Sequence, residues 1–167
     1  MAADDIAVGP FTCDVRLRRV GPIEFAREEI DGVTYMSAKD YELAYETTLE
    51  FDDGKHLSIK AQVHGEGANM MVLRNSSGEP TKMRGWVRGT VQILDEHQQT
   101  IFRGTYSDVN VVHSLAGDEA LTATGSNLEH WQSCFGEGPY IGRFLSFRVD
   151  MTRESGDLVG KAVGIIE

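Results

Sequence analysis

A short stretch in the last third of the chain, residues 127–135, places an acid, an imidazole and an indole side by side as Glu129, His130 and Trp131. An imidazole titrates near neutral pH and can act as a general acid or base, and an indole can form an apolar wall or stabilise a cation. The stretch has no clean two-residue alternation, so we expect a loop or a one-turn helix that caps the mouth of a β-barrel. In the alternative interpretation, Trp131 and Phe135 plug the barrel end and His130 is exposed.

Two tyrosines, Tyr41 and Tyr45, lie four residues apart and therefore on the same face of a strand. A phenol inside an apolar pocket can donate a hydrogen bond to a substrate carbonyl, which assists enolisation or cyclisation. As purely structural residues, the same tyrosines would fill the core with their hydroxyl groups at its rim.

Three long predicted strands, residues 81–94, 99–112 and 139–151, each carry one face that mixes aromatic and ionisable side chains. Apolar walls with a few placed polar groups are typical of a ligand cavity. The alternative is a solvent-facing sheet surface with incidental aromatics. The candidate catalytic residues are His130, Tyr106, Arg88 and Tyr45, and the candidate substrate-binding residues are Trp131, Trp86, Tyr41, Phe102 and Phe144.

The elements that must position these side chains are strands. Residues 41–51 alternate between mostly apolar side chains and Glu42, Glu46 and Glu50. This alternation predicts a strand with one buried face and one solvent-exposed face. Similar segments recur between Gly-rich and acidic turns, and glycines inside them permit the coiling of a small barrel. We predict an all-β protein, a single antiparallel up-and-down β-barrel of about eight to ten strands with at most one or two short helices, in one domain over residues 1–167.

Three segments are less regular. Residues 23–30 fit a second strand or a short helix, residues 64–69 fit a loop before a short apolar run, and residues 120–126 fit a weaker strand. The Asp-Gly pair at 31–32 and the Asp-Asp-Gly triplet at 52–54 have the sequences of tight hairpin turns.

The chain is acidic, with 26 Asp and Glu against 16 Lys and Arg and a net charge of −10. This charge argues against nucleic acid and against anionic membrane surfaces as partners. There is no apolar run of about 18 residues, so we expect no transmembrane helix. The N-terminus lacks the order of a secretory signal, and Cys13 and Cys134 form no CxxC pair. We therefore expect a reduced, cytoplasmic protein, with a single disulfide as the alternative.

The five histidines form no HxH or HxxxH pair, so we expect no bound metal, although distant histidines can converge in a barrel. The chain has neither a complete phosphate-binding glycine motif nor a GxSxG sequence. We therefore expect no cofactor.

Residues 136–144, Gly-Glu-Gly-Pro-Tyr-Ile-Gly-Arg-Phe, resemble the glycine-rich GxGxYxG strand entry of allene oxide cyclase-like and dirigent-type barrels. The strand pair at 85–90 and 104–106 is compatible with the meander of that superfamily and, more loosely, with lipocalin-like barrels. The resemblance implies an eight-stranded antiparallel barrel that cyclises or isomerises small hydrophobic intermediates of natural-product pathways without metal or organic cofactor. The matched motif is structural, so it carries over no catalytic residue.

We therefore expect a cofactor-independent cyclase or isomerase acting on a small hydrophobic natural-product intermediate bound in the barrel. One alternative is a non-catalytic, lipocalin-like carrier of such a molecule. Another is a lyase, hydratase or hydrolase that uses His130 or His113 as its base. A homodimer is mildly favoured, because barrel faces and strand edges commonly pair.

Overall fold

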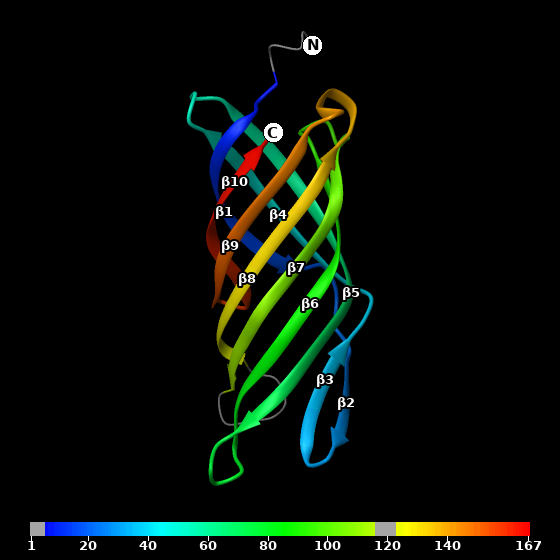
Figure 1. Ribbon diagram of the computed structural model, residues 1–167, viewed down its shortest axis with the longest axis vertical. Coiled ribbons are helices and arrows are strands. Elements are labelled where there is room, and N and C mark those ends of the chain that lie inside the picture. The colour runs from blue at the N-terminus through cyan, green and yellow to red at the C-terminus, as the bar shows by residue number, and fades with distance from the viewer. Residues whose placement is uncertain (1–5, 116–122) are drawn as a thin grey trace.

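The computed structural model describes the backbone of residues 6–115 and 123–167, and the side chains of residues 6–108 and 129–167. Ten strands occur in this part of the chain, and eight of them close into an antiparallel barrel (Figure 1). Each barrel strand pairs with the next one along the chain, and the last returns to the first. The barrel strands are β1 (Gly9–Arg19), β4 (Tyr41–Phe51), β5 (His56–Arg74), β6 (Pro80–Leu94), β7 (Thr100–Leu115), β8 (Ala123–Gly136), β9 (Phe144–Glu154) and β10 (Asp157–Ile166).

The two remaining strands, β2 (Phe25–Ile30) and β3 (Val33–Ala38), form a hairpin between β1 and β4 that leaves the barrel wall. The Asp31-Gly32 turn joins them, with both residues at positive φ, as its sequence predicts. β3 then pairs with β5 beyond the β4–β5 ladder, so the hairpin flanks the lower end of the barrel in Figure 1. Residues 25–30 are thus a strand, not a helix.

Glycines opposite aromatic rings allow the barrel to be both narrow and well filled. A Cβ atom at Gly65 would overlap the ring of Tyr41, and one at Gly89 would overlap the His64 carbonyl and the ring of Tyr106. Other rings fill the middle, including an edge-on contact between Tyr45 and Phe147 at 6.3 Å. The expected hollow therefore does not run the length of the barrel, because side chains occupy most of its interior.

The stretch predicted to be a loop, residues 127–135, is part of β8. This prediction was wrong because the stretch does alternate, but with an unusual choice of side chains. His130, Gln132 and Cys134 point inward and are buried, whereas Trp131 and Phe135 point outward and are exposed. Here polar side chains face inward and aromatic side chains face outward, the reverse of the usual strand pattern. Hydropathy alone therefore does not reveal this strand.

Two other boundaries differ from the sequence prediction. Residues 64–69 continue β5 across a bulge between Gly65 and Gly67 and do not form a loop. Before β9, Gly138–Tyr140 forms a 3-10 turn, η1, and Gly138 and Gly142 take positive φ values that interrupt a strand. β9 therefore begins at Phe144. Within the described residues no helix is long and apolar enough to cross a membrane.

The fit between glycine and ring predicts a stability difference. Gly89→Ala is expected to lower the free energy of unfolding by about 1–3 kcal/mol, because its methyl group must displace the His64 carbonyl or the Tyr106 ring. Gly67→Ala is the control, because its methyl group meets nothing nearer than the Trp86 ring at 3.8 Å. Urea unfolding of both variants measures the difference, and equal losses would contradict this account of the interior.

Candidate functional site

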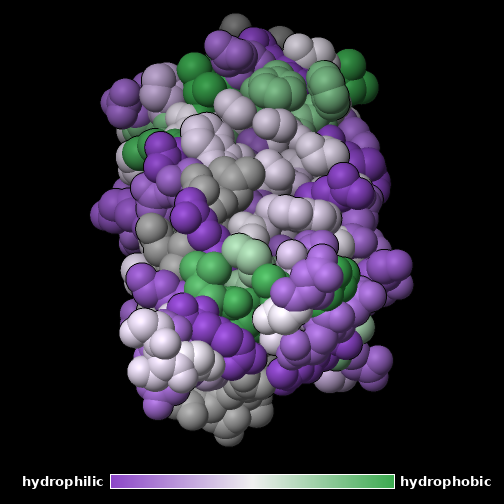
Figure 2. All heavy atoms as spheres, turned by 60° about the horizontal axis from the view of Figure 1, so that its bottom comes forward, coloured by the Kyte–Doolittle hydropathy of each residue, from purple (hydrophilic) through white to green (hydrophobic). Residues whose placement is uncertain are grey.

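A hollow opens into the barrel interior at the lower end, where β1 stops and β4 begins. It has a volume of about 100 Å³. Figure 2 turns this end toward the viewer and shows hydrophobic side chains gathered between hydrophilic ones. We call this hollow the lower cavity; its walls are Leu17, Arg19, Ile23, Phe25, Ala38, Tyr41, Leu43, Ala68, Met70, Val87, Asp108, Arg153, Gly156 and Leu158. A cavity of this volume suits a ligand of about the size of benzene.

A carboxylate stands in this mostly apolar wall, paired with a histidine. Asp108 on β7 and His130 on β8 are register partners, and Oδ1 of Asp108 lies 2.6 Å from Nδ1 of His130. The exposed fraction of each side chain is 2% or less. The geometry does not meet that of a well-aligned hydrogen bond, so the contact is a close polar approach of the two side chains. Burial raises the pKa of the Asp108 carboxyl, and His130 opposes part of that rise.

Aromatic rings hold the imidazole in place. Tyr106 stacks on His130 with 5.3 Å between ring centroids, and Phe147 lies tilted against it at 5.9 Å. Nε2 of His130 is buried and has no hydrogen-bond partner among the described residues. A buried ring nitrogen without a partner costs free energy, so the pair is not explained by stability alone.

Two tyrosine hydroxyl groups connect the surroundings of His130 to the lower cavity. The Tyr106 hydroxyl donates a hydrogen bond to the Tyr41 oxygen at 3.1 Å, which leaves the Tyr41 proton free to be donated elsewhere. Tyr41 lines the lower cavity. Burial raises the pKa of Tyr41 and, more strongly, that of Tyr106, so both remain protonated donors at neutral pH. A donor that itself accepts a hydrogen bond is polarised and strengthened.

The other predicted residues of the interior lie outside the lower cavity. Tyr45 is fully buried and donates to Oε1 of Gln132 at 2.7 Å, within the packed interior. Phe102 contacts Tyr140 of η1 at 4.8 Å between centroids. Phe144 instead lies on the outward face of β9, where it packs edge-on against the exposed Phe135.

Three further predicted residues lie, like Phe144, on the outer surface and cannot contact a ligand in the interior. Arg88 covers the ring of Trp86 at 5.3 Å, and the exposed Trp131 is covered in the same way by Arg148 at 5.1 Å. The mixed face of β6 therefore points to solvent, whereas the mixed face of β7 points inward. His113 lies outside the residues whose side chains the structure describes.

Sequence reasoning missed Asp108 as a site residue, and the signal for it was weak. Asp108 follows Tyr106 on the inward face of β7, so it is a carboxylate continuing a row of otherwise apolar or aromatic positions. An acid in such a row needs a buried partner. The partner, His130, is distant in sequence and is supplied only by the β7–β8 register.

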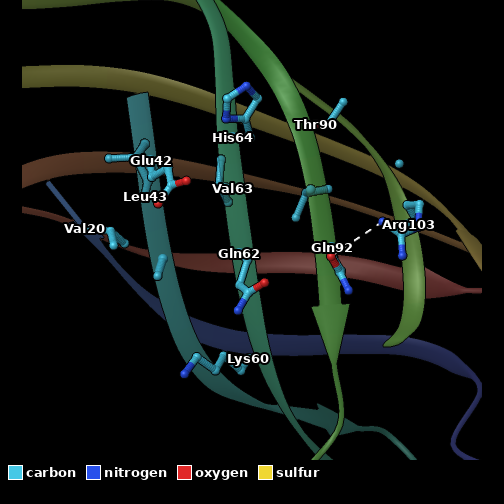
Figure 3. A pocket seen from close by; sticks show the side chains of 13 residues that line it. Val20, Glu42, Leu43, Lys60, Gln62, Val63, His64, Thr90, Gln92 and Arg103 are labelled. Carbon is cyan, nitrogen blue, oxygen red and sulfur yellow. Dashed lines mark hydrogen bonds between the residues drawn. The ribbon is translucent and has the colours of Figure 1, made fainter. Parts of the chain in front are cut away.

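A larger hollow, of about 590 Å³, lies on the outer wall across β4 to β7 (Figure 3). Its cations already have acidic partners: Lys60 contacts Glu46 at 3.6 Å, and Arg103 contacts Glu137 at 2.9 Å. The hydrogen bond that Arg103 donates to Gln92, drawn in Figure 3, gives the Arg103 guanidinium group a second partner in this wall. This hollow has no buried, unpartnered polar group aimed into it among the described residues, so the lower cavity is the better candidate.

Within the described part of the chain, no three His, Cys, Asp or Glu side chains lie close enough together to hold a metal ion. No family model, curated protein sequence or solved structure matches this chain. The resemblance to allene oxide cyclase-like barrels therefore stays a prediction.

The thiols above the site provide a direct check of interior packing. Both cysteines are free and buried, and burial raises the pKa of Cys13 to about 11 and that of Cys134 to about 12. A thiol reacts as its thiolate, so the folded protein is expected to be inert to iodoacetamide at pH 8. Mass spectrometry is expected to show alkylation of both cysteines after unfolding in urea. Rapid labelling of the folded protein would contradict a packed, dry interior.

Proposed function

We propose that this protein is a cofactor-independent isomerase that moves a proton within a small, mostly apolar carbonyl compound held in the lower cavity. One observation carries the proposal: a buried carboxyl, Asp108, and a polarised phenol, Tyr41, line the same apolar cavity of about 100 Å³. A base and a hydrogen-bond donor in a dry site are the two groups that enolisation needs.

The chemistry follows from these two roles. The Asp108 carboxylate accepts a proton from the carbon next to the carbonyl, and the electron pair of that C–H bond forms the enolate. Tyr41 donates its hydrogen bond to the carbonyl oxygen, where the negative charge develops. Asp108 then returns the proton to a different carbon, so the product is an isomer of the substrate and no redox partner is consumed. His130 does not touch the substrate; it holds the carboxylate in place and tunes its pKa.

The volume of the lower cavity distinguishes between the expected functions. Cyclisation of a long, flexible intermediate requires room to fold the chain, and typical sites for drug-sized molecules measure 300–1,000 Å³. The lower cavity is well below that range. Isomerisation of a compact molecule is therefore favoured over cyclisation. A carrier would need the same apolar walls, but the buried Asp108–His130 pair would then serve no purpose.

Asp108→Asn tests the base. It keeps the shape of the side chain and removes the proton acceptor, so turnover is expected to fall at least about a hundredfold. The probe is the β,γ-unsaturated cyclohexenone, whose conversion to the conjugated enone is followed by ultraviolet absorbance. A wild-type rate no higher than that of buffer would overturn the proposal, and binding of this probe without turnover would instead indicate a carrier.

Tyr41→Phe tests the donor in the same assay. Losing one hydrogen bond to the developing oxyanion is expected to lower kcat about a hundredfold with little change in KM. The matched control is Tyr140→Phe, which removes a buried phenol at the opposite end of the barrel, next to Phe102. Equal effects of the two substitutions would show that general destabilisation, not catalysis, explains the loss.

The pH dependence of kcat/KM tests the Asp108–His130 pair. The reaction requires the carboxylate, so activity is present above the pKa of Asp108 and is lost as the pH falls through it. Burial raises this pKa, which places the acidic limb above the ordinary aspartate value of 3.8. His130→Gln removes the group that opposes the rise, so the limb is expected to move to higher pH. An unmoved limb would exclude His130 as the positioning residue.

A further inference from the structure

Two arginines line the outer part of the lower cavity. Arg19 ends β1, in the inward-facing register of Leu17, and Arg153 lies near the end of β9, in the inward-facing register of Met151. Nε of Arg153 is buried without a hydrogen-bond partner among the described residues, while its Nη1 donates to the Gly156 carbonyl at 3.1 Å. Burial lowers the pKa of Arg153, and the positive charge of Arg19 lowers it further.

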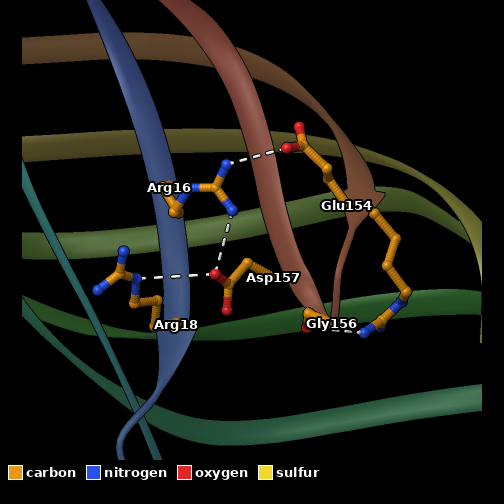
Figure 4. Close-up of polar contacts among 6 residues, drawn as sticks. Arg16, Arg18, Glu154, Gly156 and Asp157 are labelled. Carbon is orange, nitrogen blue, oxygen red and sulfur yellow. Dashed lines mark hydrogen bonds and ion pairs between the residues drawn. The ribbon is translucent and has the colours of Figure 1, made fainter.

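These two arginines differ from their outward-facing neighbours on the same strands. Arg16 contacts both Glu154 and Asp157 at 3.2 Å, and Arg18 contacts Asp157 at 3.7 Å (Figure 4). Among the described residues, no carboxylate pairs with Arg19 or Arg153. The chain carries a net charge of −10, so acidic partners are plentiful in its composition. Two cations that face one mostly apolar cavity without a described acidic partner, in so acidic a protein, therefore require an explanation.

The arginines and the Asp108–His130 pair occupy different parts of the cavity. The register places Asp108 beside His130 and His130 beside Val149. Arg153 follows Val149 by four residues, which is about 13 Å further along β9 toward the turn. β1, which carries Arg19, is separated from β7 by three intervening strands of the barrel and so lies on the opposite wall. Arg19, Arg153 and Asp108 nevertheless all line the same small cavity, so a compact ligand can meet the arginines at one end and approach Asp108 with the other.

We infer that the ligand of the lower cavity is a small carboxylate, whose anionic group sits between Arg19 and Arg153 while its apolar body extends toward Asp108. This inference rests on the proposed function only for the ligand's role as substrate. An anion between the half-buried guanidinium group of Arg153 and the exposed one of Arg19 relieves their mutual repulsion and offers acceptors to donors that have no acidic partner among the described residues. Arginine presents a planar fork that matches a carboxylate.

The experiment compares benzoate with benzamide, a neutral molecule of nearly the same shape, by isothermal titration calorimetry. Wild-type protein is expected to bind benzoate at least about tenfold more tightly than benzamide, with an advantage that shrinks as salt is added. Arg153→Gln and Arg19→Gln are each expected to remove most of that preference. Arg18→Gln is the matched control, because it removes the same charge from the outer face of β1 and is expected to keep the preference.

The outcomes separate this inference from the proposed function. Equal affinity for the two probes, binding of neither, or an equal loss in the Arg18→Gln variant would overturn the carboxylate site. Asp108→Asn is expected to keep the preference for benzoate while abolishing isomerisation. If benzoate is preferred but the cyclohexenone is not turned over, the carboxylate site stands and the isomerase proposal fails.

Discussion

The pairing of glycine with a ring across neighbouring strands is the constraint on which both the barrel and its site depend. Gly65 makes room for Tyr41, and Gly89 makes room for Tyr106, so eight strands can close around large side chains without strain. The same two rings carry the hydroxyl groups that are hydrogen-bonded to each other. Packing and chemistry therefore share residues, and a change that loosens the interior also moves the donor.

The interior is unusual in how much polarity it buries. Tyr45 and Gln132 satisfy each other in the packed part, as the two tyrosines do nearer the lower cavity. Asp108 and His130 are close together, yet Nε2 of His130 is left without a described partner. Desolvating such a pair costs several kcal/mol before its own attraction is counted, and apolar residues of similar size would avoid that cost. Its position at the wall of an apolar cavity gives a chemical reason for keeping it.

The charges around the lower end are sorted by the direction in which side chains point. Outward arginines on β1 meet acids from β9 and β10, whereas the inward arginines face the apolar space with no described acidic partner. Adjacent residues of one strand thus serve different purposes: Arg18 belongs to a surface ion pair, and Arg19 belongs to the cavity. A net charge computed over the whole chain hides this local positive field.

The sequence by itself determined most of the strands, their hairpin turns and the glycine positions that favour a barrel over a sandwich, because alternation and turn chemistry are local. It missed the strand at residues 127–135 and the continuation of β5 through residues 64–69. It also placed Tyr41 and Tyr45 on one face. It could not determine which face turns inward, because a two-residue period looks the same from either side. Barrel closure decided that Trp86 and Arg88 face solvent and that Tyr106 and Asp108 face the interior. Only the β7–β8 register could join Asp108 to His130, since hydrogen bonds between strands, and not spacing along the chain, bring residues so distant in sequence within 2.6 Å.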